Sequence, residues 1–191
     1  LMKRTLTQNE GSGRGHVRLA AVLAMSVVAT ACSGRVPSDG FKDLHYGMSL
    51  DELRSKGFAC QPDDYFCGLS PDADTKYTLF GKEASVRVKT AGGKLVAIIV
   101  HVDLSSDELI ELYKREFGDP KTFTYRSLGG QSERQYWHSG NRAAIAVTRS
   151  VTRGDMSVFG VTTSSAQYLG PEATKELLEE ASTNTVQSGD F

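Results

Sequence analysis

The chain has 191 residues with 22 Lys and Arg, 23 Asp and Glu, and a formal net charge of -1. This balance excludes the basic face that nucleic-acid binding needs, and it offers no polybasic patch for anionic lipid. Hydrophobic residues make up 39% of the chain, which at this length is enough for one domain with a sizeable core. The surplus of acid lies at 171–191, where Lys175 is the single basic residue.

Residues 1–31 have the pattern of an export signal. Basic residues precede an apolar run that begins at Leu19, and this run is shorter than the roughly 20 residues of a transmembrane helix. The segment Ala-Thr-Ala-Cys-Ser at 29–33 resembles the lipobox of bacterial lipoproteins. This resemblance implies cleavage before Cys32 and a diacylglyceryl thioether with fatty acids such as palmitate on its thiol. An ordinary signal peptide with a free Cys32 is the alternative.

The residue after Cys32 indicates a location. Ser33 rather than Asp stands there, and in many Gram-negative lipoproteins this choice accompanies sorting to the outer membrane. We therefore expect a lipid-anchored protein of the cell envelope, on the outer membrane and facing the periplasm. In this interpretation residues 32–40 are a tether and residues 41–170 are the globular domain.

Two cysteines remain in the body of the chain, Cys60 and Cys67. An even count in an oxidising compartment, with turn-forming residues between the two, predicts a disulfide that closes a short hairpin or loop. Two buried free thiols are the alternative. A metal site is disfavoured because no second Cys or His pair lies nearby in the sequence.

Two helices are predicted from the same start signature, a capping box beside an apolar staple. The boxes are Ser49 with Glu52 and Ser105 with Glu108. Gly57 ends the first helix, and the second runs to Phe117. A third helix with an acidic face is expected at 171–181, followed by a disordered tail at 182–191.

Strands are predicted where apolar and polar residues alternate between turn signals. The expected strands are 77–80, 84–90, 95–102, 121–127, 132–138, 142–149 and 155–162. The strand at 95–102 is apolar on both sides, so we expect it in the middle of a sheet.

A helix followed by an antiparallel meander thus occurs twice, at 41–103 and 104–162. The sequence therefore predicts an α+β fold of tandem helix-plus-antiparallel-meander units, with the helices packed on one side of antiparallel sheet. Coincidence is the alternative to duplication, because Ser-x-x-Glu is a generic helix start.

One motif resembles a known family. The run Tyr-Gly-Met-Ser-Leu-Asp-Glu-Leu at 46–53, followed by Gly57, resembles the helix opening of small envelope lipoproteins of the SmpA/OmlA outer-membrane assembly type. Their unit of helix plus antiparallel sheet is shared with the β-lactamase-inhibitor protein, which has two such units and disulfide-closed loops. The resemblance implies this architecture over 41–162. It assigns no functional residue.

Catalytic signatures are absent from the sequence. It has no Gly-x-Ser-x-Gly elbow, no His-Glu-x-x-His and no Gly-x-x-x-x-Gly-Lys phosphate loop. We therefore expect no enzyme activity, no cofactor and no metal. An envelope hydrolase with an unrecognised site is the alternative, and it would need a pocket where His45, His101 or His138 meets a carboxylate.

The loop that the predicted disulfide closes is the expected partner contact. Asp63, Asp64, Tyr65 and Phe66 place two acids beside two aromatic rings, the residue type that anchors many interfaces. A disulfide stiffens such a loop and reduces the entropy lost on docking. In the alternative, a ring packs under its own hairpin. We expect a non-catalytic protein-binding module, either an envelope-assembly factor or an inhibitor or immunity protein, with a periplasmic protein partner and no nucleic acid.

Overall fold

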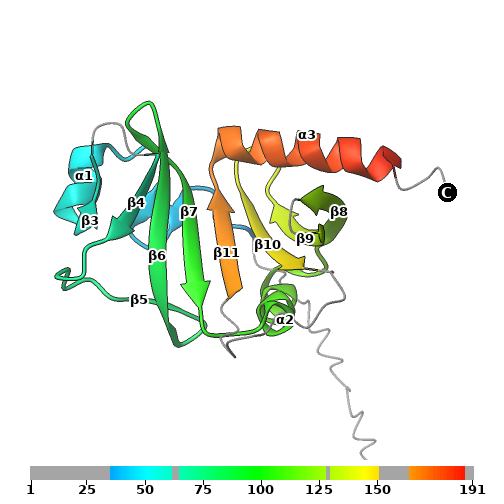
Figure 1. Ribbon diagram of the computed structural model, residues 1–191, viewed down its shortest axis with the longest axis horizontal. Helices are drawn as coiled ribbons and strands as arrows, with labels where there is room; N and C mark the ends of the chain where they lie inside the picture. Colours follow the sequence, from blue (N-terminus) through cyan, green and yellow to red (C-terminus); the bar gives the residue numbers. More distant parts are fainter. Residues whose placement is uncertain (1–34, 62–64, 128–129, 151–163, 188–191) are drawn as a thin grey trace, which may run out of the picture. The chain divides into compact units, whose positions relative to one another are not determined.

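The computed structural model describes residues 35–61, 65–127, 130–150 and 164–187 (Figure 1). The predicted signal at 1–31, the lipidation site Cys32 and the strand expected at 155–162 lie outside the described residues. So do Asp63 and Asp64 of the predicted contact loop. The account below concerns the described part of the chain between Cys32 and Phe191.

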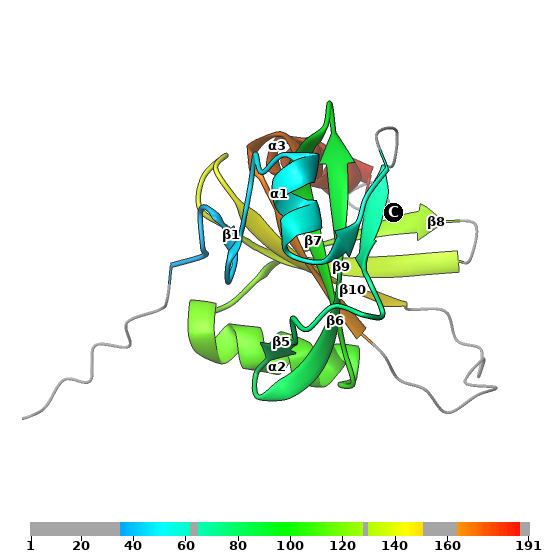
Figure 2. The same cartoon turned by 90° about the vertical axis from the view of Figure 1, so that its left-hand side faces the viewer.

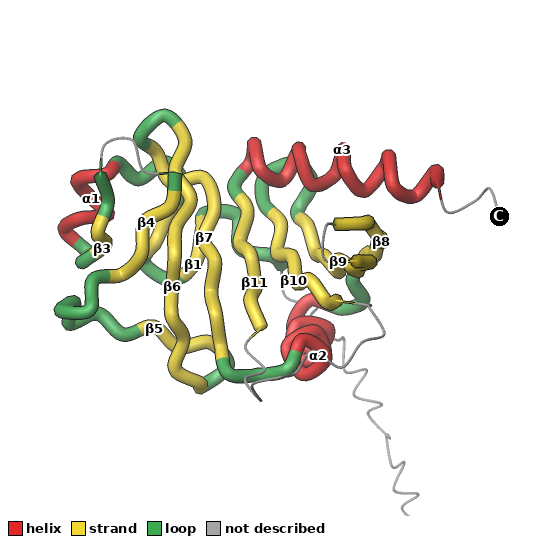
Figure 3. Tube along the Cα trace, viewed as in Figure 1, coloured by secondary structure: helices red, strands yellow, loops and turns green. Residues whose placement is uncertain are grey.

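Strands make up most of the regular secondary structure in the described chain. A short pair, β1 (Gly40–Phe41) and β2 (Leu44–His45), precedes a nine-stranded antiparallel sheet (Figure 3). The strands of that sheet are β3 (Phe58–Ala59), β4 (Phe66–Leu69), β5 (Tyr77–Leu79), β6 (Lys82–Ala91), β7 (Lys94–Val102), β8 (Lys121–Ser127), β9 (Gly130–His138), β10 (Ala144–Ser150) and β11 (Ser164–Leu169). Their order is β3-β4-β6-β7-β11-β10-β9-β8, and β5 pairs with β6 beside β4.

The predicted fold class is wrong. The described residues do not form tandem helix-plus-meander units with helices on one side of antiparallel sheet; they form one large sheet with a two-stranded pair and three helices. The cause is β11, which pairs with β7 on one side and with β10 on the other. This late strand joins the two expected meanders into a single sheet. Its Ser and Gln residues gave too weak an apolar alternation to predict it.

The helices are α1 (Leu50–Ser55), α2 (Ser106–Phe117) and α3 (Pro171–Gln187). Both predicted capping boxes are confirmed, since Ser49 and Ser105 each exchange hydrogen bonds with the Glu three residues later. Helix α3 continues to Gln187, beyond the predicted end at Ala181. Polar side chains after Ala181 donate hydrogen bonds to carbonyls of the preceding turn.

The sheet separates two hydrophobic clusters. Ile145 of β10 belongs to the cluster that includes Leu109 and Tyr113 of α2. The next residue, Ala146, belongs to the cluster that includes Leu177 of α3. Because neighbouring strand residues point to opposite faces, α2 and α3 pack on opposite faces of the sheet. Figures 1 and 2 both show strands between the two helices.

A buried contact between two tyrosine hydroxyls in the first hydrophobic cluster allows a test of its contribution to stability. The hydroxyls of Tyr113 and Tyr168 lie 2.8 Å apart, and burial raises the pKa of Tyr168 to about 12. Tyr113→Phe should lower the free energy of unfolding by about 1–3 kcal/mol, because it leaves the Tyr168 hydroxyl buried without this partner. The double variant with Tyr168→Phe should lose less than the sum of the single variants. Urea unfolding measures all three, and strict additivity would contradict the predicted coupling.

Candidate functional site

Tyr65 and Phe66 are the two large hydrophobic residues that the described chain leaves exposed, at 54% and 40%. Their rings meet edge to face with centroids 4.8 Å apart. Neither ring is buried beneath its own hairpin. The structure thus places two of the four predicted contact residues together on the surface, at the start of β4.

The backbone beneath the two rings is held at several points. Cys60 and Cys67 form a disulfide, as predicted, with Cα atoms 4.9 Å apart, and the Cys67 side chain is buried. The Thr90 amide of β6 donates a hydrogen bond to the Tyr65 carbonyl at 2.9 Å. Strand pairing and the disulfide therefore fix the position from which the rings project.

Two cations of β6 lie against these rings. The Arg87 guanidinium carbon is 5.4 Å from the centroid of Phe66, and the Lys89 ammonium is 4.7 Å from that of Tyr65. Cations over aromatic faces are attracted by the ring quadrupole. We call Tyr65, Phe66, Arg87 and Lys89 the aromatic–cation cluster. Among the described residues, no ion pair joins either cation to a carboxylate.

The cluster borders an uncovered part of the sheet. Residues directly opposite each other in paired strands share a face, and the register aligns Gly68, Arg87, Ile99 and Gln167 across four strands. A second row aligns Ser85, His101 and Ser165. All of these residues are exposed or half-buried. We call these two rows the open face.

Helix α3 covers the neighbouring part of the same face, over Ala97, Ala144 and Ala146. A groove of about 180 Å³ lies between α3 and the open face and is lined by Lys89 and Ile99 among others. The other cation in its lining, Arg134, is paired with Glu180 of α3 at 3.1 Å. The cationic character of this region therefore comes from Arg87 and Lys89.

A hollow extends the open face on its other side. Strand β4 pairs with β6 at Arg87–Lys89 and β5 pairs with it at Lys82–Ala84, so the two strands leave Ser85 and Val86 between them. A hollow of about 560 Å³ lies here, with Arg87 in its lining. The open face is thus accessible to solvent through the gap between β4 and β5 as well as directly from the side of the sheet on which it lies.

The three histidines among the described residues have separate surroundings on β2, β7 and β9. The His45 ring lies 3.7 Å from an Asp39 oxygen on the surface. His101 belongs to the open face, where burial and the charge of Arg87 lower its pKa, so its imidazole is neutral near pH 7. His138 Nδ1 is 3.2 Å from the Gly140 carbonyl oxygen. Within the described ranges, no group of His, Cys, Asp and Glu residues is placed to hold a metal ion.

One hollow of about 380 Å³ brings His138 near Asp119 and Ser139 in its lining. These residue types are those of a hydrolase, but the contacts do not join them. The Ser139 hydroxyl accepts a hydrogen bond from Arg35 Nε at 3.3 Å, and no hydrogen bond or ion pair between His138 and Asp119 occurs in this described region. The hollow therefore contains no assembled pair of nucleophile and base.

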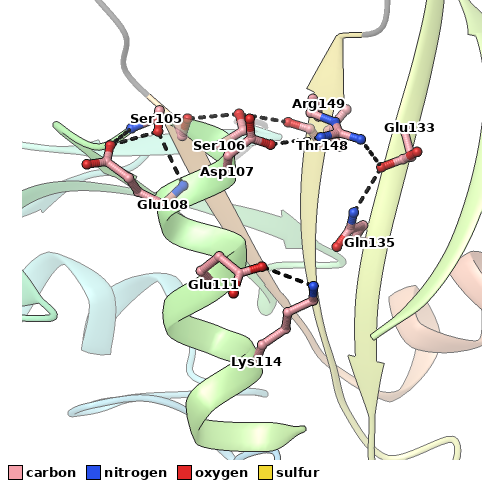
Figure 4. A network of polar contacts seen from close by, with 11 residues as sticks. Ser105, Ser106, Asp107, Glu108, Glu111, Lys114, Glu133, Gln135, Thr148 and Arg149 are labelled. Carbon is pink, nitrogen blue, oxygen red and sulfur yellow. Dashed lines mark hydrogen bonds and ion pairs between the residues drawn. The ribbon is translucent and has the colours of Figure 1, made fainter. Parts of the chain in front are cut away.

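A polar network ties α2 to the sheet, as Figure 4 shows. Arg149 donates to Asp107 and to Glu133, both at 2.8 Å, and Gln135 donates to the same Glu133. The hydrogen bond to Asp107 and the charges of both acids raise the pKa of Arg149. Arg149 thus pairs with carboxylates inside the fold, whereas Arg87 has no carboxylate partner among the described residues.

Sequence reasoning missed the two cations of the cluster. The predicted strand at 84–90 alternates apolar and polar residues, so its pattern puts Arg87 and Lys89 on the polar side, but it does not indicate which residues lie opposite them. Their partners are Gly68 and Phe66 of β4, and only the pairing of β4 with β6 brings these residues together. The feature of the sequence that indicates this part of the cluster is the presence of two basic residues at alternate positions of one predicted strand.

The comparisons with known proteins add no relative. No protein-family model matches the chain, and neither a curated protein nor a solved structure matches it. Among the residues that the structure describes, no helix has the length and apolar character needed to cross a bilayer.

The disulfide yields a stability prediction. The double variant Cys60→Ala/Cys67→Ala should lower the free energy of unfolding by about 2–3 kcal/mol, because an eight-residue loop is no longer closed in the unfolded chain. Replacing both cysteines avoids a new free thiol. Urea unfolding of the variant and the parent gives the difference. Mass spectrometry after alkylation without reductant is the control, and two modified thiols at Cys60 and Cys67 in the folded parent would contradict the bond.

Proposed function

We propose that this protein is a non-catalytic protein-binding module, held at the cell envelope by a lipid on Cys32, that contacts a periplasmic protein through the aromatic–cation cluster. The observation that carries the proposal is the adjacent pair Tyr65 and Phe66, exposed on a backbone that a disulfide and strand pairing hold in place. Rigid exposed aromatic side chains lose little entropy on docking and supply much apolar contact.

The chemistry of the cluster supports binding rather than turnover. Its four side chains are two aromatic rings and two basic groups, and the cluster includes no carboxylate, imidazole, thiol or aliphatic hydroxyl, the groups that most hydrolases use. An envelope-assembly factor or an inhibitor or immunity protein would use such a surface. An inhibitor would present the two exposed rings of Tyr65 and Phe66 to an enzyme cleft.

The proposed location rests on the sequence. The apolar run before Cys32, its small residues and Ser33 support lipidation and sorting to the outer membrane, with the folded part facing the periplasm. Several acyl chains on one protein exceed the two signals that stable anchoring needs. The binding surface would then act close to the membrane.

The aromatic pair provides the test of binding. A photoreactive amino acid at position 68 of the full chain should capture the partner in intact envelopes, after which binding kinetics with the purified partner can be measured. Tyr65→Ala and Phe66→Ala should each weaken that binding by about 2 kcal/mol or more, because interface energy concentrates in a few aromatic anchors.

A matched control lies at the other end of the sheet order. Thr124→Ala changes an exposed residue of β8 and should leave both binding and thermal stability unchanged. If Tyr65→Ala and Phe66→Ala bind the partner as tightly as the parent does, the cluster is not the contact. Catalytic turnover by the purified protein, retained through successive purification steps, would contradict the non-catalytic role.

Lipidation has its own test. The parent chain should incorporate a fatty-acid analogue during growth and remain in the membrane fraction, whereas Cys32→Ser should do neither, because the thiol is the site of acyl attachment. Metabolic labelling and membrane flotation measure the two effects. Labelling of the Cys32→Ser variant would contradict the assignment, and an unlabelled parent would favour an ordinary signal peptide.

A further inference from the structure

We propose that the partner contacts the open face with an extended acidic segment, whose carboxylates at alternate residues pair with Arg87 and Lys89. This inference rests on the proposed protein-binding function and adds the chemistry of the partner.

The first argument is that, among the described residues, Arg87 and Lys89 have no carboxylate partner, unlike Arg134 and Arg149 of the same sheet. Lys56 pairs with Asp43 at 2.6 Å, Arg134 with Glu180, and Arg149 with two acids. Within the described residues Arg87 and Lys89 have aromatic contacts instead. A ring face satisfies charge but accepts no strong hydrogen bond, so the N–H donors of both groups remain available to carboxylates.

The second argument is spacing. Arg87 and Lys89 are two residues apart on β6, which places them on the same face about 6.6 Å apart along the strand. Alternate residues of any extended segment have the same repeat. Two carboxylates on one side of an extended chain therefore match the two cations.

The third argument is the space available beside Arg87 for an incoming chain. Gly68 lies directly opposite Arg87, and a Cβ atom built there would meet no other group within 4 Å. An incoming chain can thus reach the guanidinium from the β4 side. The rings of Tyr65 and Phe66 border the same space and offer apolar contact to the residues beside the carboxylates.

Two acids among the described residues limit the length of the segment. Glu83 lies four residues from Arg87 on the same face of β6, about 13 Å away, which exceeds the screening length at physiological salt. Glu176 of α3 lines the groove together with Lys89. Acidic side chains beyond these two points would be repelled, so the favoured segment is short and centred on the two cations.

Gly68 allows a test that keeps all four cluster residues. Gly68→Glu places a carboxylate opposite Arg87 and should compete for it, and Gly68→Gln is the matched uncharged control. The protein is expressed from the full chain and purified in a nonionic detergent. The probe is a dodecapeptide of alternating Glu and Leu with a neutral fluorophore, and its binding is measured by fluorescence anisotropy.

The parent protein should bind this peptide, and binding should weaken as salt concentration rises. Gly68→Gln fills the space opposite Arg87 and should weaken binding by steric hindrance alone, whereas Gly68→Glu should weaken it by about tenfold more, through competition for Arg87 and repulsion of the peptide. A peptide with Lys in place of Glu should not bind. Matching thermal melts of the two Gly68 variants show that the fold is kept.

Several results would overturn the inference. A second peptide has the same composition but its Glu residues are adjacent rather than alternating. If it binds as tightly as the alternating peptide, the proposed match between alternate carboxylates and the two cations is wrong. Binding to vesicles of phosphatidylglycerol and phosphatidylethanolamine, but not to the peptide, would assign the cations to lipid headgroups. Self-association that Gly68→Glu abolishes, without peptide binding, would assign them to a second copy.

The same variants separate this inference from the proposed function. If the partner captured in intact envelopes loses affinity with Phe66→Ala but not with Gly68→Glu, the protein-binding function stands and the acidic segment is wrong. If neither variant changes that affinity, both the function of the cluster and the chemistry of its occupant are wrong.

Discussion

Strand β6 pairs with β4, β5 and β7, and its alternating side chains divide the sheet into a buried and an exposed side. Val86 and Val88 are buried in the core, whereas Arg87 and Lys89 face outward. A slip of one residue would exchange these sets, burying two charges and exposing two valines. An unpaired buried charge is far more costly than any single strand contact, so the register is strongly determined. The aromatic–cation cluster depends on that register, because it fixes which β4 residues lie opposite the cations.

The exposure of Tyr65 and Phe66 is unfavourable for the isolated protein. Leaving a large apolar side chain in water forgoes about 1.5–3 kcal/mol relative to full burial. The contacts with Arg87 and Lys89 offset only part of this, at about 0.5–1 kcal/mol for each exposed cation–π pair. The disulfide and the strand pairing keep the rings from collapsing onto the core. The remaining apolar surface is what a partner can bury, which is why the cluster favours association.

Local sequence patterns predicted the helix starts and individual strands well. They did not predict which strands pair when those strands are distant in the sequence. The capping boxes at Ser49 and Ser105 and the strand at 121–127 depend on neighbouring residues, and the structure has them as predicted. The disulfide also follows from a short separation. The fold class failed because β11 inserts between strands that are distant in the sequence, and no periodicity within Ser164–Leu169 indicates that position. The candidate site was half predicted for the same reason: its aromatic residues are adjacent in the sequence, but its cations come from another strand.

Residue size explains why the second face of the sheet is only partly covered. Under α3 the sheet presents Ala97, Ala144 and Ala146, whose small side chains let the helix pack closely. Beyond this alanine surface the same face carries Arg87, His101 and Gln167, which are polar and too bulky for a helix to cover without burying charge. The boundary of α3 is therefore set by the sheet beneath it. The open face is then a consequence of the same strands that form the core, and its cations stay in contact with solvent, where an acidic partner segment can reach them.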